Sequence, residues 1–424
     1  MKLIVETSRD TPLVWYQVFA RGGAAADPEG LEGFVRHAAE LARRGAGERS
    51  RADIDQALDQ LGASLNVSAT RDRIVFSGVC LSRNLEATLA IAADVLARPR
   101  FDADEHAKLV TETRSVIDEV RDDDGSLAQR FFVREFGGPA RYTRTALGTD
   151  DSIGRFDVGA ARDAFCRMVV PDNLVIGFAG DIDEASARAL AARLVSDLRT
   201  DPATELPDVG AAPPLGPRRA LLVDKPERTQ VQLMVGHTAP RFGTDEFDAL
   251  SVVETIFGGT FTSRLMQELR VKHGWTYGAS CRAGRARGPL WFRIDFASAA
   301  DVAAQALARA LEMFRDIAAD GITEAELAFA KSYLTGSWPF SIATARNRLR
   351  VRAEEAILGL PEGYGMAWPE RLGAITLEQT RAAAQQWLHP DNAVTIAVAT
   401  AEDMLDALSA LPIGDLQVTP HDSY

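Results

Sequence analysis

Two short segments with the same layout constrain the fold of this chain more than any other feature. PDNLVIGFAGDID at 171–183 and PDNAVTIAVATAED at 390–403 each place a Pro-Asp-Asn turn before an apolar strand. Each segment also follows one amphipathic helix pattern and precedes another. One such turn would mean little, but two copies in the same context indicate that a domain has been duplicated.

A proline-rich stretch marks the boundary between the two copies. Residues 201–219, DPATELPDVGAAPPLGPRR, leave neither a helix nor a strand a continuous run. The chain has 424 residues, which is more than one hydrophobic core usually supports. We therefore predict an N-terminal domain at 1–200, a linker at 201–219 and a C-terminal domain at 220–424.

Both halves repeat one order of elements. An apolar strand at 11–20 corresponds to one at 229–238, and later stretches of alternating polarity predict further strands. Helices are expected at 30–44, 50–62, 84–97 and 101–121 in the first half, and at 245–256, 262–274, 301–318 and 323–335 in the second. This order predicts an α+β fold of two homologous domains, each a mainly antiparallel sheet with helices packed on it.

Composition excludes some classes of partner. The formal net charge is −13, from 60 acidic and 47 basic residues, which argues against nucleic acid and favours a solubility role for the acidic surface. No uncharged apolar run of about 18 residues occurs, so no membrane span is expected. The start, MKLIVETSRD, and three scattered cysteines (Cys80, Cys166 and Cys281) favour the cytoplasm.

One histidine lies where a catalytic metal helix would be expected. Residues 30–45 read GLEGFVRHAAELARRG, which places His37 on a short helix after the first strand. A catalytic zinc needs three protein ligands and an open position for water. Two histidines one turn apart would supply two ligands, but positions 33 and 41 are Gly and Leu. A lone helical histidine is more typical of a packed side chain.

The two α+β halves, the Gly-Leu start of a helix near residue 30 and the segment at 261–278 together resemble the pitrilysin (insulinase) family. That family includes insulin-degrading enzyme, the mitochondrial processing peptidase and bacterial two-subunit peptidases. Its signature is the inverted zinc motif H-x-x-E-H, followed about 76 residues later by a glutamate ligand. The resemblance covers essentially the whole chain and implies the fold of a zinc peptidase.

Aligned on that motif, the chain departs from the family at three positions. Gly33 replaces the first zinc-binding histidine, Arg36 replaces the glutamate that activates water, and His37 is retained. The third ligand corresponds to Thr113, which has Glu112 beside it. Glycine has no donor atom, a guanidinium stays protonated and threonine is a poor zinc ligand. The resemblance therefore implies a degenerate motif, with no metal bound by this chain and no catalytic residue in it.

An improvised metal site remains an alternative. His37 and Glu40 share a helical face, and Glu112 is the nearby acidic residue. Exposed helical glutamates are usually just solvated, so we do not expect these three residues to replace the lost ligands.

The second half retains a motif that the first half has lost. Residues 258–278, GGTFTSRLMQELRVKHGWTYG, resemble the family segment in which an arginine and a tyrosine seven residues apart bind substrate. Here these residues are Arg270 and Tyr277. Gly274 is expected to end the helix, so that Tyr277 lies on the next strand, while Trp275 replaces a smaller apolar residue. The alternative is a surface arginine and a half-buried strand tyrosine with no role in binding.

The resemblance implies a non-catalytic subunit of a heterodimeric zinc peptidase. In related two-part enzymes, the zinc helix of one half faces the second half of the partner across a closed chamber. Arg270 and Tyr277 would then bind peptide substrates, and a homologous partner subunit would carry the zinc. The alternatives are a structural or peptide-binding protein of the same fold, and an enzyme with an unrelated active site. The sequence offers no local Ser/His/Asp or Cys/His signature for the latter.

Overall fold

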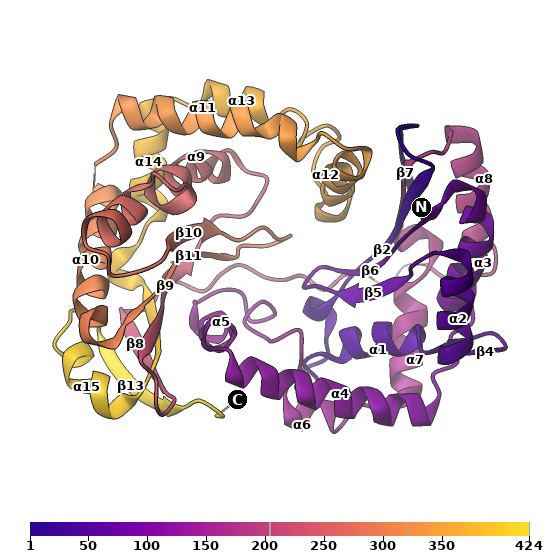
Figure 1. Ribbon diagram of the computed structural model, residues 1–424, viewed down its shortest axis with the longest axis horizontal. Coiled ribbons are helices and arrows are strands. Elements are labelled where there is room, and N and C mark those ends of the chain that lie inside the picture. Colours follow the sequence, from indigo (N-terminus) through magenta and orange to yellow (C-terminus); the bar gives the residue numbers. More distant parts are fainter. Residues whose placement is uncertain (203–204, 320, 424) are drawn as a thin grey trace. The chain divides into compact units, whose positions relative to one another are not determined.

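The computed structural model of the protein describes residues 1–202, 205–319 and 321–423. They form two compact units, and each unit draws on three stretches of the chain (Figure 1). Unit 1 comprises the ranges Met1–Ile117, Arg144–Asp208 and Pro339–Ala367. Unit 2 comprises the ranges Asp118–Thr143, Val209–Trp338 and Trp368–Tyr424.

Each unit contains one large sheet. The sheet of unit 1 has the strand order β1 (Lys2–Thr7), β7 (Leu174–Gly180), β2 (Leu13–Arg21), β6 (Arg73–Leu81) and β5 (Asn66–Ala69). The sheet of unit 2 has the order β10 (Ala279–Ala283), β11 (Trp291–Ala299), β9 (Gln230–Thr238), β12 (Val394–Ala399), β8 (Arg219–Asp224) and β13 (Asp415–Pro420). Strands β3 (Gly45–Ala46) and β4 (Arg49–Ser50) form a separate short hairpin.

The two sheets share a topology of five strands, to which unit 2 adds β13 parallel to β8. In unit 1, β1 is parallel to β7 and the other pairs are antiparallel. In unit 2, β8 is likewise parallel to β12, and antiparallel pairs continue through β9, β11 and β10. The Pro-Asp-Asn turns form 3₁₀ turns directly before β7 and β12. The predicted α+β fold of two homologous, mainly antiparallel domains is confirmed.

Helices pack on both sheets. Those of unit 1 are α1 (Phe34–Ala42), α2 (Arg51–Leu61), α3 (Leu85–Ala97), most of α4 (Ala103–Asp122), α6 (Asp150–Ile153), α7 (Val158–Met168), α8 (Glu184–Leu194) and α12 (Ala345–Leu358). Those of unit 2 are α5 (Asp124–Glu135), α9 (Asp245–Glu254), α10 (Ala300–Ala319), most of α11 (Glu324–Ser341), α13 (Trp368–Ala374), α14 (Leu377–Trp387) and α15 (Ala401–Ser409). The helix expected from residue 30 begins only at Phe34, because Gly33 adopts a left-handed conformation with φ 84°.

Helices α5 and α12 are exchanged between the sequence halves. Every residue of β7 and of β12 is buried. Helix α12, from the second half, packs on β7 and β1, whereas α5, from the first half, packs on β12 and β9 (Figure 1). A side chain at Gly177 of β7 would place its Cβ 2.4 Å from Leu349 of α12, so glycine makes room for this helix. The repeat along the sequence and the compact units therefore differ by these two helices.

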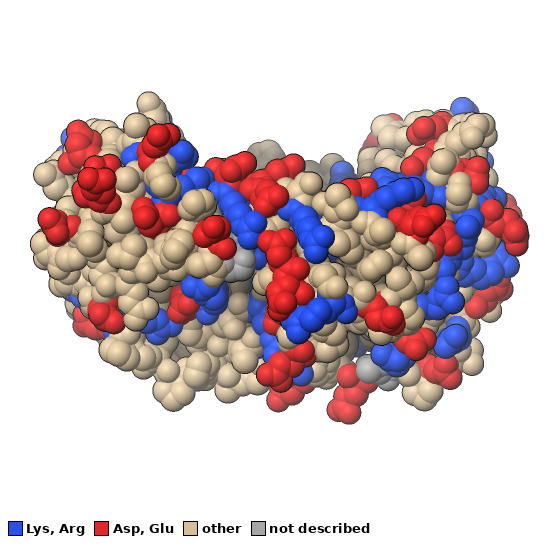
Figure 2. Space-filling view, turned by 90° about the horizontal axis from the view of Figure 1, so that it is seen from below, with Lys and Arg blue, Asp and Glu red and all other residues tan. Residues whose placement is uncertain are grey.

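The surface mixes charges of both signs. Figure 2 shows Lys and Arg side chains interspersed with Asp and Glu on the face that it draws. Among the described residues, no helix combines the length and the apolarity that crossing a membrane requires. Cys80 and Cys281 are buried, Cys166 is partly exposed, and all three are free thiols.

Candidate functional site

The degenerate zinc motif lies at the start of α1, where a buried carboxylate holds the chain. Asp27 accepts hydrogen bonds from the backbone N–H groups of Gly33 and Val35, each at 2.8 Å. Gly33 is the N-cap of α1 and Val35 lies in its first turn, where the backbone N–H groups find no acceptor within the helix. Burial raises the pKa of Asp27 to about 7, although these two hydrogen bonds oppose the shift.

Gly33 leaves no room for a side chain. A Cβ atom added at this residue would lie 2.7 Å from the backbone nitrogen of Gly148. Its positive φ would also strain any other residue. The position that corresponds to the first histidine of the family motif is therefore closed by backbone in this chain.

His37 is buried in a contact with a second histidine. Its Nε2 atom lies 2.8 Å from Nδ1 of His106 on α4, and its ring packs on Phe156 with centroids 5.1 Å apart. Burial, with the neighbouring His106 and arginines, lowers the pKa of His37 to about 3, so the imidazole is neutral. Its Nδ1 atom has no hydrogen-bond partner in the described part of the chain. His106 was not anticipated from the sequence, because it is distant from the motif along the chain.

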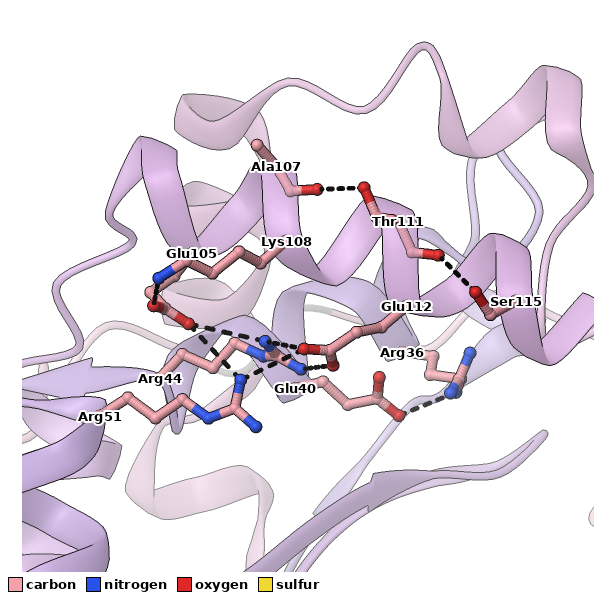
Figure 3. A network of polar contacts seen from close by, with 10 residues as sticks. All are labelled: Arg36, Glu40, Arg44, Arg51, Glu105, Ala107, Lys108, Thr111, Glu112 and Ser115. Atoms are coloured by element: carbon pink, nitrogen blue, oxygen red, sulfur yellow. Dashed lines mark hydrogen bonds and ion pairs between the residues drawn. The ribbon is translucent and has the colours of Figure 1, made fainter.

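Arginines neutralise the acidic side chains of this region (Figure 3). Arg44, which follows α1, donates to both carboxylate oxygens of Glu112 on α4 and lies 3.5 Å from a carboxylate oxygen of Glu105. Arg51 adds a contact of 3.3 Å to Glu112. The hydrogen bond from Arg44 holds the pKa of Glu112 down at about 2. A guanidinium therefore supplies the positive charge that Glu112 faces.

The remaining residues of the motif do not converge on a metal position. Arg36 donates to Glu40 over 2.8 Å, within one turn of α1, and Thr113 is buried on α4. Glu40 and Glu112 are each bound by arginine, so the improvised site that includes His37 is not assembled. In the described ranges, no group of three or more His, Cys, Asp or Glu side chains is arranged to hold a metal ion. The residues present do not fit a zinc ion.

Arg270 and Tyr277 lie in an irregular segment of unit 2. Arg270 is on a π-helical turn (Met266–Lys272), and a second π-helical turn (Thr255–Gly259) precedes it. Such turns are rare and occur frequently at functional sites. Gly274 has φ 67° and ends the helical turn, as expected. Tyr277, however, lies in the loop before β10 rather than on the strand.

Both side chains are available to a ligand. Tyr277 is 89% exposed, so the half-buried tyrosine of the alternative interpretation is wrong. The Arg270 guanidinium lies over the ring of Phe261, 4.5 Å from its centroid. Among the described residues, its charge is not paired with a carboxylate. Trp275 stacks on His273, with centroids 4.0 Å apart, and its ring packs against the core of unit 2.

Comparisons with known proteins agree on one family. Residues 2–136 match the family model described as insulinase (peptidase family M16), and residues 155–334 match the one described as peptidase M16 inactive domain. An uncharacterized zinc protease of Mycobacterium leprae is 26% identical over 404 residues, which are 89% of this chain and 84% of that protein. A Helicobacter pylori protein named as a non-peptidase homolog is 22% identical over 380 residues, 89% of this chain and 87% of its own length.

A solved structure shares the fold. The crystal structure of a peptidase M16 inactive domain from Pseudomonas fluorescens aligns with a TM-score of 0.85 at 23% identity. The alignment covers 93% of this chain and 94% of that chain.

The closed position at Gly33 predicts a specific loss of stability. We expect Gly33→Ala to lower the free energy of unfolding by about 2–4 kcal/mol, from backbone strain and from the clash with Gly148. Gly62→Ala is the matched control, because Gly62 also has a positive φ but has open space around its Cβ position. It should lose only about 1 kcal/mol. Equal losses in denaturant titrations of the two variants would show that Gly148 imposes no constraint.

The raised pKa of Asp27 predicts a pH-dependent stability. The folded protein holds a proton on Asp27 that the unfolded chain releases, since the ordinary pKa is 3.8 and the folded value is about 7. This contribution is complete below pH 3.8 and is lost as pH rises through 7. Relative to Asp27→Asn, the free energy of unfolding of the wild type should fall by at most about 1.4 kcal/mol per pH unit between pH 5 and 7. Unfolding free energies that differ by a constant amount across this range would refute the titration.

The ion pair of Arg44 predicts a stability loss that an exposed pair does not share. Arg44→Met removes the main cation of Glu112 and a second, longer contact of Glu105, whose nearer partner is Lys108. The loss of these charge-assisted hydrogen bonds should destabilise the protein by about 1–3 kcal/mol. Arg188→Met is the control, because Arg188 and Glu184 form an exposed pair on α8. Its loss should stay within about 0.5 kcal/mol. Thermal unfolding that ranks the two variants equally would contradict a structural role for Arg44.

Proposed function

Because the chain belongs to the insulinase family, peptidase family M16, we propose that it is the non-catalytic, peptide-binding subunit of a two-subunit zinc peptidase. One contrast carries this proposal. The residues of the degenerate zinc motif take part in packing and ion pairs, whereas the side chains of Arg270 and Tyr277 are available to contact a ligand.

The first half of the chain supports the non-catalytic part of the proposal. Hydrolysis in this family needs a metal-bound water and a carboxylate base. Arg36 cannot accept a proton, and it already pairs with Glu40. Gly33 offers no ligand, and Arg44 binds Glu112. We therefore assign the zinc and the base to a homologous partner subunit with an intact H-x-x-E-H motif.

The second half supports the peptide-binding part. The guanidinium of Arg270 presents several donors in a fixed plane, which suits a peptide carbonyl or carboxylate. The Tyr277 hydroxyl adds one donor on a rigid ring. Placed beside the partner's metal, these donors would orient the scissile peptide and stabilise the negative charge that develops on its carbonyl oxygen. The π-helical turns around Arg270 are consistent with a segment shaped for binding.

The proposal predicts that activity appears only on assembly. We expect this chain alone to contain no zinc and to leave a fluorogenic peptide uncleaved, while a mixture with a zinc-bearing homologue cleaves faster than the homologue alone. In that mixture, Arg270→Ala and Tyr277→Phe should each lower kcat/KM roughly 10- to 100-fold and leave the zinc content unchanged. Val271→Ser is the control, since Val271 is exposed beside Arg270 and is not one of the two residues assigned to substrate binding.

Other outcomes would reject the proposal. Stoichiometric zinc and peptide cleavage by the lone chain would show that the alignment of Gly33, Arg36 and Thr113 with the lost site is wrong. Unaltered activity of a double variant, Arg270→Ala with Tyr277→Phe, would remove the role assigned to these residues. A chain that binds peptides but stimulates no zinc-bearing homologue would favour a structural or peptide-binding protein without a peptidase role.

A further inference from the structure

A pocket of about 690 Å³ opens beside the Arg270–Tyr277 segment of unit 2. Its walls come from the first π-helical turn and the loop after it, from β10, and from α11. Phe261 lines the pocket and also carries the guanidinium of Arg270. Gly278, the neighbour of Tyr277 in the chain, lines it as well. The pocket therefore borders the segment that carries Arg270 and Tyr277.

Two further arginines give the pocket a positive charge. Arg282 and Arg285 line it, and neither pairs with a carboxylate among the described residues. Arg285 lies over the ring of Phe242, 5.2 Å from its centroid, much as Arg270 lies over Phe261. An aromatic ring positions a guanidinium without neutralising it, so these charges remain available.

The pairing of β10 with β11 adds to this charge. Arg282 lies directly opposite Arg293 in the register of the two strands. Like charges in opposite positions repel each other, and an anion between them would relieve the repulsion. Asp295 pairs with Arg293 at 3.3 Å and so offsets the charge of that arginine, whereas Arg282 has no carboxylate partner among the described residues.

Glu254, one of two acids that line the pocket, opposes the positive charge only weakly. Its side chain is partly buried and accepts a hydrogen bond of 3.0 Å from the backbone N–H of Ala283. Burial raises the pKa of Glu254 to about 7, so much of it is protonated near neutral pH. With Arg282 and Arg285 facing Asp295 and a partly protonated Glu254, the pocket keeps an excess of positive charge in a chain whose net charge is −13.

The walls also offer apolar contact. Phe261 is 64% exposed and Tyr333 of α11 is 46% exposed, and both line the pocket. Exposed aromatic rings next to arginine are the composition that dominates binding energy at protein interfaces. The volume of about 690 Å³ lies within the range of pockets that bind small molecules, so a peptide side chain fits in it.

We propose that this pocket binds a carboxylate of the peptide that Arg270 and Tyr277 hold, which makes the chain selective for acidic peptides. The inference rests on the proposed function and deepens it by naming a substrate class. Arg282 and Arg285 contact the carboxylate, while Phe261 and Tyr333 pack against the neighbouring part of the peptide.

Binding of labelled peptides to the full chain tests this selectivity without a partner. The probes are fluorescein-labelled peptides of ten residues, each with one glutamate at a different position of an otherwise neutral sequence. Each peptide has a counterpart with glutamine at that position. All are made with a free and with an amidated C-terminus. For one glutamate position, we expect binding about tenfold tighter than that of the glutamine peptide. Arg282→Gln and Arg285→Gln should bring the ratio of the two affinities, glutamate peptide to glutamine peptide, toward one. Added salt should also lower this ratio.

Arg241→Gln is the matched control, because Arg241 is an exposed arginine of unit 2 that does not line the pocket. It should leave the ratio unchanged, and melting temperatures should confirm that all variants fold. A second result would also support the pocket. If amidation of the peptide's C-terminus weakens binding to the wild type but not to the pocket variants, and glutamine substitution has no effect, the bound carboxylate is the C-terminal one of the peptide. Equal affinities for all peptides, in wild type and variants, would overturn the proposal.

The test separates this proposal from the function on which it rests. If Arg270→Ala weakens binding of all peptides and no peptide shows a carboxylate preference, the peptide-binding function stands and the acidic selectivity falls. If Arg282→Gln abolishes a clear preference and Arg270→Ala changes nothing, the pocket stands and the role of the Arg270–Tyr277 pair falls.

Discussion

Each sheet of this protein depends on one helix that covers its most buried strand. Strands β7 and β12 are buried along their whole length, and each would expose one face to water without α12 or α5. The fit is close, since Leu349 occupies the space that a side chain on Gly177 would need. Because each covering helix comes from the other half of the sequence, neither half contains all of its own core. The loops and helices that carry the candidate sites are positioned on these completed sheets.

On that scaffold, the residues of the first half that align with the zinc motif take part in packing and ion pairs. Glu112 meets a bidentate guanidinium, and His37 meets another imidazole in a buried contact. A bidentate pair whose arginine is buried contributes more than a pair exposed on both sides, which is typically worth less than about 1 kcal/mol. The second half has the opposite character. Arg270 rests on an aromatic ring, so its charge is oriented but remains unused within the described residues. One chain thus combines a neutralised site with an available one.

Much of the fold follows from local patterns in the sequence. The repeated Pro-Asp-Asn turns identified β7 and β12 and the duplication, because a turn followed by an apolar strand is a local signal. The exchange of α5 and α12 could not be foreseen, since an amphipathic helix shows the same period whichever sheet it covers. The start of α1 was misplaced because the left-handed conformation of Gly33 depends on Asp27 and on the nearby backbone of Gly148.

The residues of the candidate sites could be predicted from the sequence, but the side chains that surround them could not. The spacing of Arg270 and Tyr277 was visible in the sequence, whereas the contact of Arg270 with Phe261 exists only in three dimensions. His106 and Arg44 were missed, because their partners are far away along the chain and no motif marks them.

The bridge between Arg44 and Glu112 also changes what the folded chain requires from its surroundings. A metal-bridged helix pair loosens when a chelator or a competing protein withdraws the ion. A pair joined by arginine and glutamate is built entirely from the polypeptide, so this contact between Arg44 and α4 needs no metal ion to form. In an assembly of the proposed kind, metal scarcity would silence one subunit chemically, while this chain would persist intact and ready to receive a newly loaded partner.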